Sequence, residues 1–303
     1  MRNNTLAVKE LRSMVRGQVM CNAPMVQYTT WRVGGPADIL LIPYDAEDVF
    51  NACQLARRYD LPITVIGNGS NILVKDAGIR GLTIRTAGGL TGVEAIGEGK
   101  VRVNAGTMVG SLIGYCIRHS LAGLEFLAGI PATIGGATIM NAGAMGQCIG
   151  EILRAVEVLD PDMVVRQYQR KDLNFEYRRS SLMGTQKIVL AAELGVKPGN
   201  RAHITERARQ NLVMRRKQQP LNSPSAGSVF INPPGWAAGY LIEKAGGKGL
   251  TRGGASVSTK HANFIVNTGR ATASDILGLI DEVRALVQKQ FNILLETEIQ
   301  ILG

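Results

Sequence analysis

The sequence predicts an α+β protein that is divided into two main parts. Short apolar runs of strand length are interspersed with longer stretches of helical periodicity, and there is no internal repeat. The chain has 303 residues, of which 45% are hydrophobic, which is enough for two or three domains with their own cores. The turn-forming run Pro198-Gly199-Asn200 marks the boundary between the two parts.

The first part begins with a short helical extension, expected over residues 1–28. Asp45 is a typical N-cap for a helix over 46–59, with Asp48 at the third helical position, and another helix is expected over 107–120. Strands are expected at 39–42, 63–66, 72–74, 81–85, 101–104, 155–159, 164–168 and 188–192.

The second part is predicted as three helices and two strands. The helices are expected at 204–217, 237–245 and 274–290, and the strands at 263–267 and 293–302. The first of these helices is basic. Its arginines and lysine form either a solvated face or a surface that attracts the phosphates of ligands.

The charge of the chain favours anionic small molecules over nucleic acid. The formal net charge is +10 and the isoelectric point is about 9.7, but only 5% of the residues are aromatic and none interleave with basic runs. We therefore expect no nucleic-acid partner. The protein is also expected to be a monomer.

The cysteines and histidines are too scattered to predict a metal site or a disulfide framework. Free thiols in a reducing cytosol are the simplest interpretation. The N-terminus lacks the apolar core of a signal peptide, and the most apolar stretch, 124–140, is interrupted by Glu125, Pro131 and glycines. A cytoplasmic protein without membrane insertion is expected.

Two Gly-rich segments are candidates for ligand binding. The loop Gly67-Asn68-Gly69-Ser70-Asn71 follows a predicted strand, but Ile72 stands where a dinucleotide fingerprint needs its third glycine. The loop is either an ordinary turn or a main-chain cradle for phosphate. The segment 129–146 (GIPATIGGATIMNAGAMG) is rich in Gly and Ala, which leave the main chain accessible. Its main chain either contacts a flat cofactor or packs closely against other parts of the protein.

An ordered series of motifs resembles the UDP-N-acetylenolpyruvoylglucosamine reductase (MurB) family, and its compact spacing is similar to the type II members. The resemblance extends from Thr29 to Gly303. It comprises TWRVGGPA (30–37), GNGSN (67–71), GIPATIGGATIMNAGA (129–144), FEYRRS (175–180), PSAGSVF (224–230), GGA (253–255), KHANF (260–264) and LETEI (295–299).

This resemblance implies an FAD-binding region of the vanillyl-alcohol-oxidase (PCMH) type over 29–197, with subdomains of about 29–90 and 91–197. A C-terminal α+β substrate-binding domain would follow over 201–303. The implied FAD-binding residues are Gly67, Asn68, Gly69, Ser70, Asn71, Gly129, Ile130, Pro131, Gly135, Gly136, Asn141, Ala142 and Gly143. No histidine lies in either Gly-rich segment, so noncovalent FAD is expected.

The implied reaction reduces the enolpyruvyl group of a UDP-amino sugar with NADPH, in peptidoglycan precursor synthesis. Hydride would pass from NADPH to FAD and then to the terminal carbon, while Ser228 protonates the α carbon. Arg178 would hold the substrate's anionic oxygen, and Glu298 would assist proton delivery. Without the resemblance, Ser228 reads as a turn residue, Arg178 as a surface residue, and Glu296 and Glu298 as equivalent.

Further substrate contacts are implied at Asn232, Lys217 and His261. The chain departs from the family pattern at Ile231, where a lysine is usual, and at Met145, where a tyrosine is frequent. An FAD oxidase acting on another alcohol or sugar, and an inactive flavin-binding sensor, are the competing hypotheses. The presence of Arg178, Ser228 and Glu298 together argues against the sensor.

Overall fold

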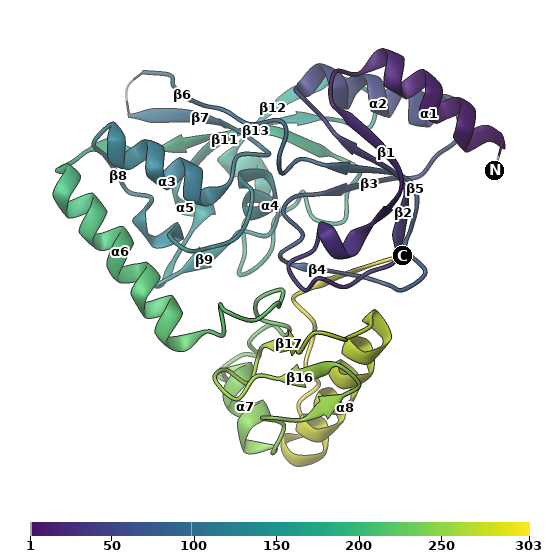
Figure 1. Ribbon diagram of the computed structural model, residues 1–303. Coiled ribbons are helices and arrows are strands. Elements are labelled where there is room, and N and C mark those ends of the chain that lie inside the picture. Colours follow the sequence, from purple (N-terminus) through teal and green to yellow (C-terminus); the bar gives the residue numbers. More distant parts are fainter. Residues whose placement is uncertain (1, 98) are drawn as a thin grey trace. The chain divides into compact units, whose positions relative to one another are not determined.

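The computed structural model of the chain describes residues 2–97 and 99–303, which form two compact units (Figure 1). Unit 1 comprises the residues up to Asn22 together with 38–68 and 80–213, and unit 2 comprises 23–37, 69–79 and 214–303. Both units mix helices and strands, which confirms the α+β class. The domain boundaries predicted at 28–29 and 197–201 stay predictions, because compact units need not coincide with domains.

Unit 1 contains most of two larger sheets (Figure 1). One has the strand order β1-β2-β5-β3, in which β3 and β5 are parallel, and the other is antiparallel with the order β12-β11-β13-β7-β6. The bounds are Gln18–Pro24 (β1), Pro36–Ile42 (β2), Ile63–Ile66 (β3), Ile79–Arg85 (β5), Val93–Ala95 (β6), Lys100–Asn104 (β7), Leu153–Leu159 (β11), Val165–Gln169 (β12) and Ile188–Gly195 (β13).

The helices of unit 1 pack against these strands around one continuous apolar core, which includes Leu41, Leu82, Val103 and Leu112. The helices are α1 (Arg2–Met14), α2 (Ala46–Arg58), α3 (Val109–Arg118), α4 (Ile134–Ile139) and α5 (Ile149–Ile152). Short pairings, β9 (Gly143–Ala144) with β10 (Gln147–Cys148) and β8 (Leu121–Ala122) with β14 (Lys197–Pro198), shape the loops.

Unit 2 is built on a small antiparallel sheet and two helices. Strands β15 (Thr251–Arg252), β16 (Ala255–Val257) and β17 (Ile265–Asn267) form the sheet, and α7 (Ala238–Lys244) and α8 (Ala273–Phe291) share its core. Strand β18 (Gln300–Leu302) pairs in parallel with β4 (Ile72–Val74). Trp31 is fully buried in the same core, and its indole nitrogen donates to the Ile265 carbonyl at 2.7 Å.

Helix α6 (Arg201–Gln218) carries the basic run and continues from unit 1 into unit 2. None of the helices in the described part of the chain is long and apolar enough to cross a membrane.

Two expectations about secondary structure are wrong. The helical extension over 1–28 ends at Met14, and residues 18–24 form strand β1 instead, because the helical periodicity stops before Gly17. The strand expected over 293–302 is regular only at 300–302, while Thr297 makes an isolated bridge to Phe230. Strands β6, β15 and β16 were not predicted, because runs of two or three residues carry too little periodicity.

Asp48 joins three segments of unit 1. Its buried carboxylate accepts main-chain N–H bonds from Arg16 (2.9 Å), Gly17 (2.8 Å) and Tyr44 (2.7 Å). Its own main-chain N–H is capped by the carboxylate of Asp45, as the sequence predicted. Charge-assisted bonds to main-chain donors compensate the burial of the carboxylate and fix the end of α1 beside the start of α2.

We expect Asp48→Asn to lower the free energy of unfolding by about 2–3 kcal/mol, because an amide NH₂ would then face main-chain donors in a buried site. Asp45→Asn is the matched control. Asparagine caps helices as well as aspartate does, so this variant loses only the exposed ion pair with Arg16, at a cost below about 1 kcal/mol. Urea denaturation followed by circular dichroism measures both, and equal losses would contradict the assigned role of Asp48.

Candidate functional site

The structure brings the start of the first Gly-rich loop, Gly67 and Asn68, together with the second Gly-rich segment in unit 1. The Asn68 side-chain amide donates to the Pro131 carbonyl at 2.8 Å. Gly67 lies against the buried Thr133, whose hydroxyl caps α4 by accepting from the Gly136 N–H at 3.3 Å. Residues that are far apart in the sequence therefore form one surface, as a shared cofactor would require.

Three of the predicted cofactor-binding glycines are needed for close packing of the main chain. An added Cβ would lie 2.4 Å from the Thr133 hydroxyl at Gly67, 2.9 Å from the Ala105 Cβ at Gly135, and 2.4 Å from the Gln147 carbonyl at Gly143. A side chain would clash at each of these distances, so close packing requires glycine at the three positions.

Gly136 is different, because the space above it is open. A Cβ there would meet only the Thr133 hydroxyl, at 3.4 Å, and the residue is half-buried. Gly129, Ile130 and Ala142 are also half-buried, and Pro131 is exposed. The whole stretch 126–150 contains no charged side chain. A neutral surface of main chain and small side chains fits the ring system of a flavin.

Asn141 links the second Gly-rich segment to the turn that carries Arg178. Its buried side-chain amide donates to the Glu176 carbonyl at 2.7 Å and accepts from the Gly150 N–H at 3.0 Å. Glu176 and Arg179 pair through both main-chain hydrogen bonds, which closes the turn. The side chain of Asn141 was predicted to bind the cofactor, and its contacts to the protein were not foreseen.

Arg178 lies in this tight turn with a φ of 58°, a left-handed conformation that costs a non-glycine residue about 1–2 kcal/mol. Its guanidinium stacks over the Tyr177 ring, 5.2 Å from the ring centroid, and donates to the Gly143 carbonyl at 3.3 Å. Strain of this kind tends to occur at functional sites. The guanidinium is therefore held against the predicted cofactor segment by contacts within unit 1.

In unit 2, the segment that carries Ser228 pairs with the segment that carries Glu298. The Glu298 N–H donates to the Val229 carbonyl at 2.8 Å, and the Ile231 N–H donates to the Glu296 carbonyl at 2.9 Å. Ser228 and Glu298 are both half-buried, whereas Glu296 is exposed. Two of the three predicted catalytic residues therefore lie on adjacent strand-like segments.

The C-terminal half of the first Gly-rich loop also reaches Glu298. The Asn71 side-chain amide donates to the Glu298 carbonyl at 3.1 Å, and the Asn71 carbonyl accepts from the Gln300 N–H at 2.9 Å. Gly69 has a φ of 67°, and a Cβ on it would lie 2.2 Å from the Tyr28 carbonyl, so the loop requires glycine there. Ser70, between Gly69 and Asn71 in the loop, is half-buried.

The predicted substrate-binding residues are arranged less compactly. The side chain of Asn232 accepts from the Ala238 N–H at 2.9 Å, at the start of α7, and the ring of His261 contacts Phe264. Burial lowers the pKa of His261, and nearby Lys248 lowers it further. A neutral imidazole has one acceptor nitrogen and one N–H donor, and here Nδ1 accepts from the Asn263 N–H at 3.2 Å, which leaves the other nitrogen as a donor. Lys217 is exposed on α6.

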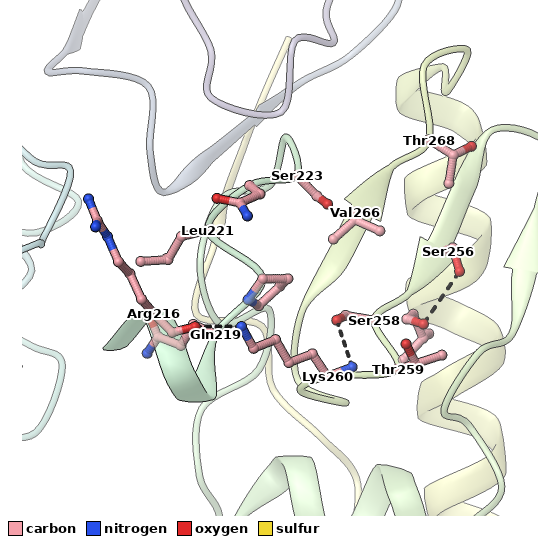
Figure 2. Close-up of a pocket in the computed structure, with 13 residues that line it drawn as sticks. Arg216, Gln219, Leu221, Ser223, Ser256, Ser258, Thr259, Lys260, Val266 and Thr268 are labelled. Atoms are coloured by element: carbon pink, nitrogen blue, oxygen red, sulfur yellow. Dashed lines mark hydrogen bonds between the residues drawn. The ribbon is translucent and has the colours of Figure 1, made fainter. Parts of the chain in front are cut away.

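A polar groove of about 580 Å³ lies within unit 2 (Figure 2). Its floor is the outer face of β16 and β17, where Ser256 pairs with Val266. Lys260 crosses the groove and donates to the Arg216 carbonyl. The groove is lined by Arg216, Gln219, Pro220, Leu221, Asn222, Ser223, Ser256, Val257, Ser258, Thr259, Lys260, Val266 and Thr268.

None of these lining residues is acidic, and Arg216 and Lys260 are cations, so the groove suits an anionic, hydrogen-bonding ligand. It contains the neighbours of Lys217 and His261 rather than those residues themselves.

The described residues contain no cluster of three or more His, Cys, Asp or Glu side chains that could hold a metal ion. The four cysteines are free, and burial raises the pKa of the Cys53 thiol to about 11 and that of Cys116 to about 12. These two buried thiols are therefore unreactive at neutral pH.

Comparisons with known proteins agree with this arrangement. Residues 37–166 match the family described as FAD binding domain, and residues 219–302 match the C-terminal domain of UDP-N-acetylenolpyruvoylglucosamine reductase. The chain is 46% identical to the reductase of that name from Moorella thermoacetica over 300 residues, which cover 99% of this chain and 98% of that protein.

Solved structures give the same result. The crystal structure of the Thermus caldophilus reductase (MurB) superposes with a TM-score of 0.80 at 37% identity, covering 95% of this chain and 99% of that one. A structure of alkyldihydroxyacetonephosphate synthase, 17% identical, shares the fold over 64% of this chain and 40% of that chain with a TM-score of 0.51. The predicted fold, with an FAD-binding region of the vanillyl-alcohol-oxidase type and a C-terminal domain, is confirmed.

Gly136→Ala should weaken FAD binding about tenfold, because the new methyl group occupies open space where the flavin would pack. The FAD-free protein should be as stable as the wild type or more so, since alanine is favoured over glycine in helices by about 1 kcal/mol. Gly135→Ala is the control: its methyl group meets Ala105, so the FAD-free protein should lose about 1–3 kcal/mol. Fluorescence titration with FAD and thermal unfolding separate the two effects, and unchanged FAD affinity in Gly136→Ala would refute the assignment.

Proposed function

Because the chain belongs to the UDP-N-acetylenolpyruvoylglucosamine reductase family, we propose that it uses NADPH to reduce UDP-N-acetylglucosamine enolpyruvate to UDP-N-acetylmuramate. Its FAD binding domain makes it an FAD-dependent oxidoreductase. The observation that carries the proposal is the main-chain pairing of the Ser228 segment with the Glu298 segment in unit 2. The proposed role is in making peptidoglycan precursors in the cytoplasm, where we propose that the protein acts as a monomer.

The chemistry that FAD supplies when bound is hydride transfer, taken from NADPH and delivered to the terminal carbon of the enolpyruvyl group. The new C–H bond converts the double bond into a single bond and leaves an electron pair shared by the α carbon and the carboxylate. The protein must stabilise that charge and supply one proton to the α carbon. Both tasks fall to the candidate catalytic residues.

Arg178 supports the first task. Its guanidinium offers a planar set of N–H donors that suits a carboxylate. The stacking on Tyr177 and the bond to Gly143 leave it little freedom to reorganise. A preorganised cation of this kind stabilises developing negative charge more than a mobile one.

Ser228 and Glu298 support the second task. A serine hydroxyl is a weak acid, but the electron-rich α carbon is a strong base, so the transfer is favourable in that direction. Glu298, half-buried on the segment that pairs with Val229, would orient the hydroxyl or a water molecule that restores its proton. Asn232, Lys217 and His261 remain candidates for contacts with the sugar and the phosphates, and Ile231 replaces the usual lysine with an apolar side chain.

A flavin oxidase of the same fold is the second candidate function. The alkyldihydroxyacetonephosphate synthase likeness shows that this fold serves other chemistry, but it covers only 64% of the chain. The match of 219–302 to the reductase C-terminal domain favours the reductase.

We expect the purified protein to be yellow, with FAD that heat or acid releases to the supernatant. NADPH should bleach the flavin band under anaerobic conditions, and UDP-N-acetylglucosamine enolpyruvate should restore it. Reoxidation by oxygen but not by this substrate would favour an oxidase, and a colourless protein that takes up no added FAD would exclude both.

Ser228→Ala should leave FAD binding and flavin reduction by NADPH nearly unchanged, because protonation belongs to the second half-reaction. Reoxidation of the flavin by the substrate should slow by at least about a hundredfold, the lower end for loss of a positioned general acid. Glu298→Gln should slow the same step. Stopped-flow absorbance at the flavin band measures each half-reaction. If Ser228→Ala blocks reduction by NADPH and leaves reoxidation by the substrate unchanged, Ser228 is not the proton donor.

A further inference from the structure

We infer that Asn263 is a positioning residue, which fixes the main chain next to Ser228 and thereby the place where the Ser228 hydroxyl meets the substrate. The inference rests on the proposed function of Ser228. Asn263 lies just before β17, and only 4% of its surface is exposed.

The side-chain amide of Asn263 binds both polar main-chain groups of one residue. The Phe230 N–H donates to Asn263 Oδ1 at 2.9 Å, and Asn263 Nδ2 donates to the Phe230 carbonyl at 2.8 Å. The amide thus replaces a neighbouring strand along this edge. The Asn263 main chain adds a third bond, because its carbonyl accepts from the Val229 N–H at 2.8 Å.

The opposite edge of the same segment is bonded to the strand-like segment that contains Glu298. There the Val229 carbonyl accepts from the Glu298 N–H at 2.8 Å and the Ile231 N–H donates to the Glu296 carbonyl at 2.9 Å. The main chain after Ser228 is therefore held from both sides, and the side chains of Val229 and Phe230 are buried.

Upstream of Ser228, the Pro224 carbonyl accepts from the Asn267 N–H at 2.9 Å, and Gly227 separates this bond from Ser228. Gly227 has a φ of 77°, and a Cβ added to it would meet no atom within 4 Å. Ser228 therefore lies between a glycine, whose main chain can adopt many conformations, and Phe230, whose main chain is fixed by hydrogen bonds. Without the Asn263 amide, two buried main-chain groups of Phe230 would lack their partners, and the segment could rotate about Gly227 to find others.

Asn267 provides a matched control in the same unit. It is also buried, with 7% exposed, and its amide is also bonded to main chain on both sides. Its Nδ2 donates to the Trp31 carbonyl at 3.0 Å and its Oδ1 accepts from the Gly269 N–H at 2.8 Å, so it does not touch 228–231. A variant of Asn267 reports what loss of a buried amide does to stability alone.

The experiment compares Asn263→Ser and Asn267→Ser in the FAD-loaded protein. Asn263→Ser should slow flavin reoxidation by the substrate about tenfold, leave reduction by NADPH unchanged, and speed amide hydrogen exchange at 229–231. Asn267→Ser should leave both half-reactions and this exchange unchanged. Asn263→Asp, which keeps the acceptor for the Phe230 N–H and loses the donor, carries the same test if the serine variant does not fold.

A double-variant cycle shows whether Asn263 acts through Ser228. In a Ser228→Ala background, Asn263→Ser should slow reoxidation by less than about twofold, because the group that it positions is gone. A full tenfold loss in that background, or an equal effect of Asn267→Ser, would overturn the inference. If reoxidation is normal in Asn263→Ser but slow in Ser228→Ala, the inference about Asn263 is overturned and the proposed function stays intact. Normal reoxidation in Ser228→Ala itself would overturn both.

Discussion

A buried main-chain segment outside regular structure must find a partner for each of its N–H and carbonyl groups. Val229 and Phe230 meet this requirement, through the side chain and main chain of Asn263 on one side and the Glu298 N–H on the other. The same bonds that satisfy the main chain also set the distance between the Ser228 and Glu298 segments. In unit 2, the hydrogen bonds that buried main-chain groups require are therefore the same bonds that place the candidate catalytic groups.

Unit 1 meets the same requirement with a second buried asparagine. The amide of Asn141 bonds to the Glu176 carbonyl and the Gly150 N–H, and so ties the turn that carries Arg178 to the second Gly-rich segment. A short amide side chain can donate and accept at once, which a carboxylate or a hydroxyl of similar size cannot do with the same geometry. Buried networks of this kind specify a single arrangement when every member is satisfied.

The sequence predicted the regular elements better than the roles of individual residues. Helix α2 begins after Asp45 as expected, and α8, β3 and β4 lie close to their predicted ranges, because periodicity and capping are local signals. The two Gly-rich segments were found, but Gly67 and Gly135 serve close packing and Gly136 faces open space. That difference depends on Thr133 and Ala105, neighbours in space that no local pattern reveals. An asparagine inside the apolar run 262–266 was the available sign that Asn263 is buried and bonded.

The choice between Glu296 and Glu298 shows what the fold adds to the family resemblance. Alternation along a strand places both on one face, and the resemblance alone selects Glu298. In the structure, the two residues have different surroundings: Glu296 is exposed, whereas Glu298 is half-buried and its main-chain carbonyl accepts from the Asn71 side-chain amide. A carboxylate that is partly withdrawn from water interacts more strongly with a nearby hydroxyl or substrate, because the effective dielectric constant is lower. The difference in exposure, which alternation along the sequence does not reveal, is thus what distinguishes the two glutamates in the structure.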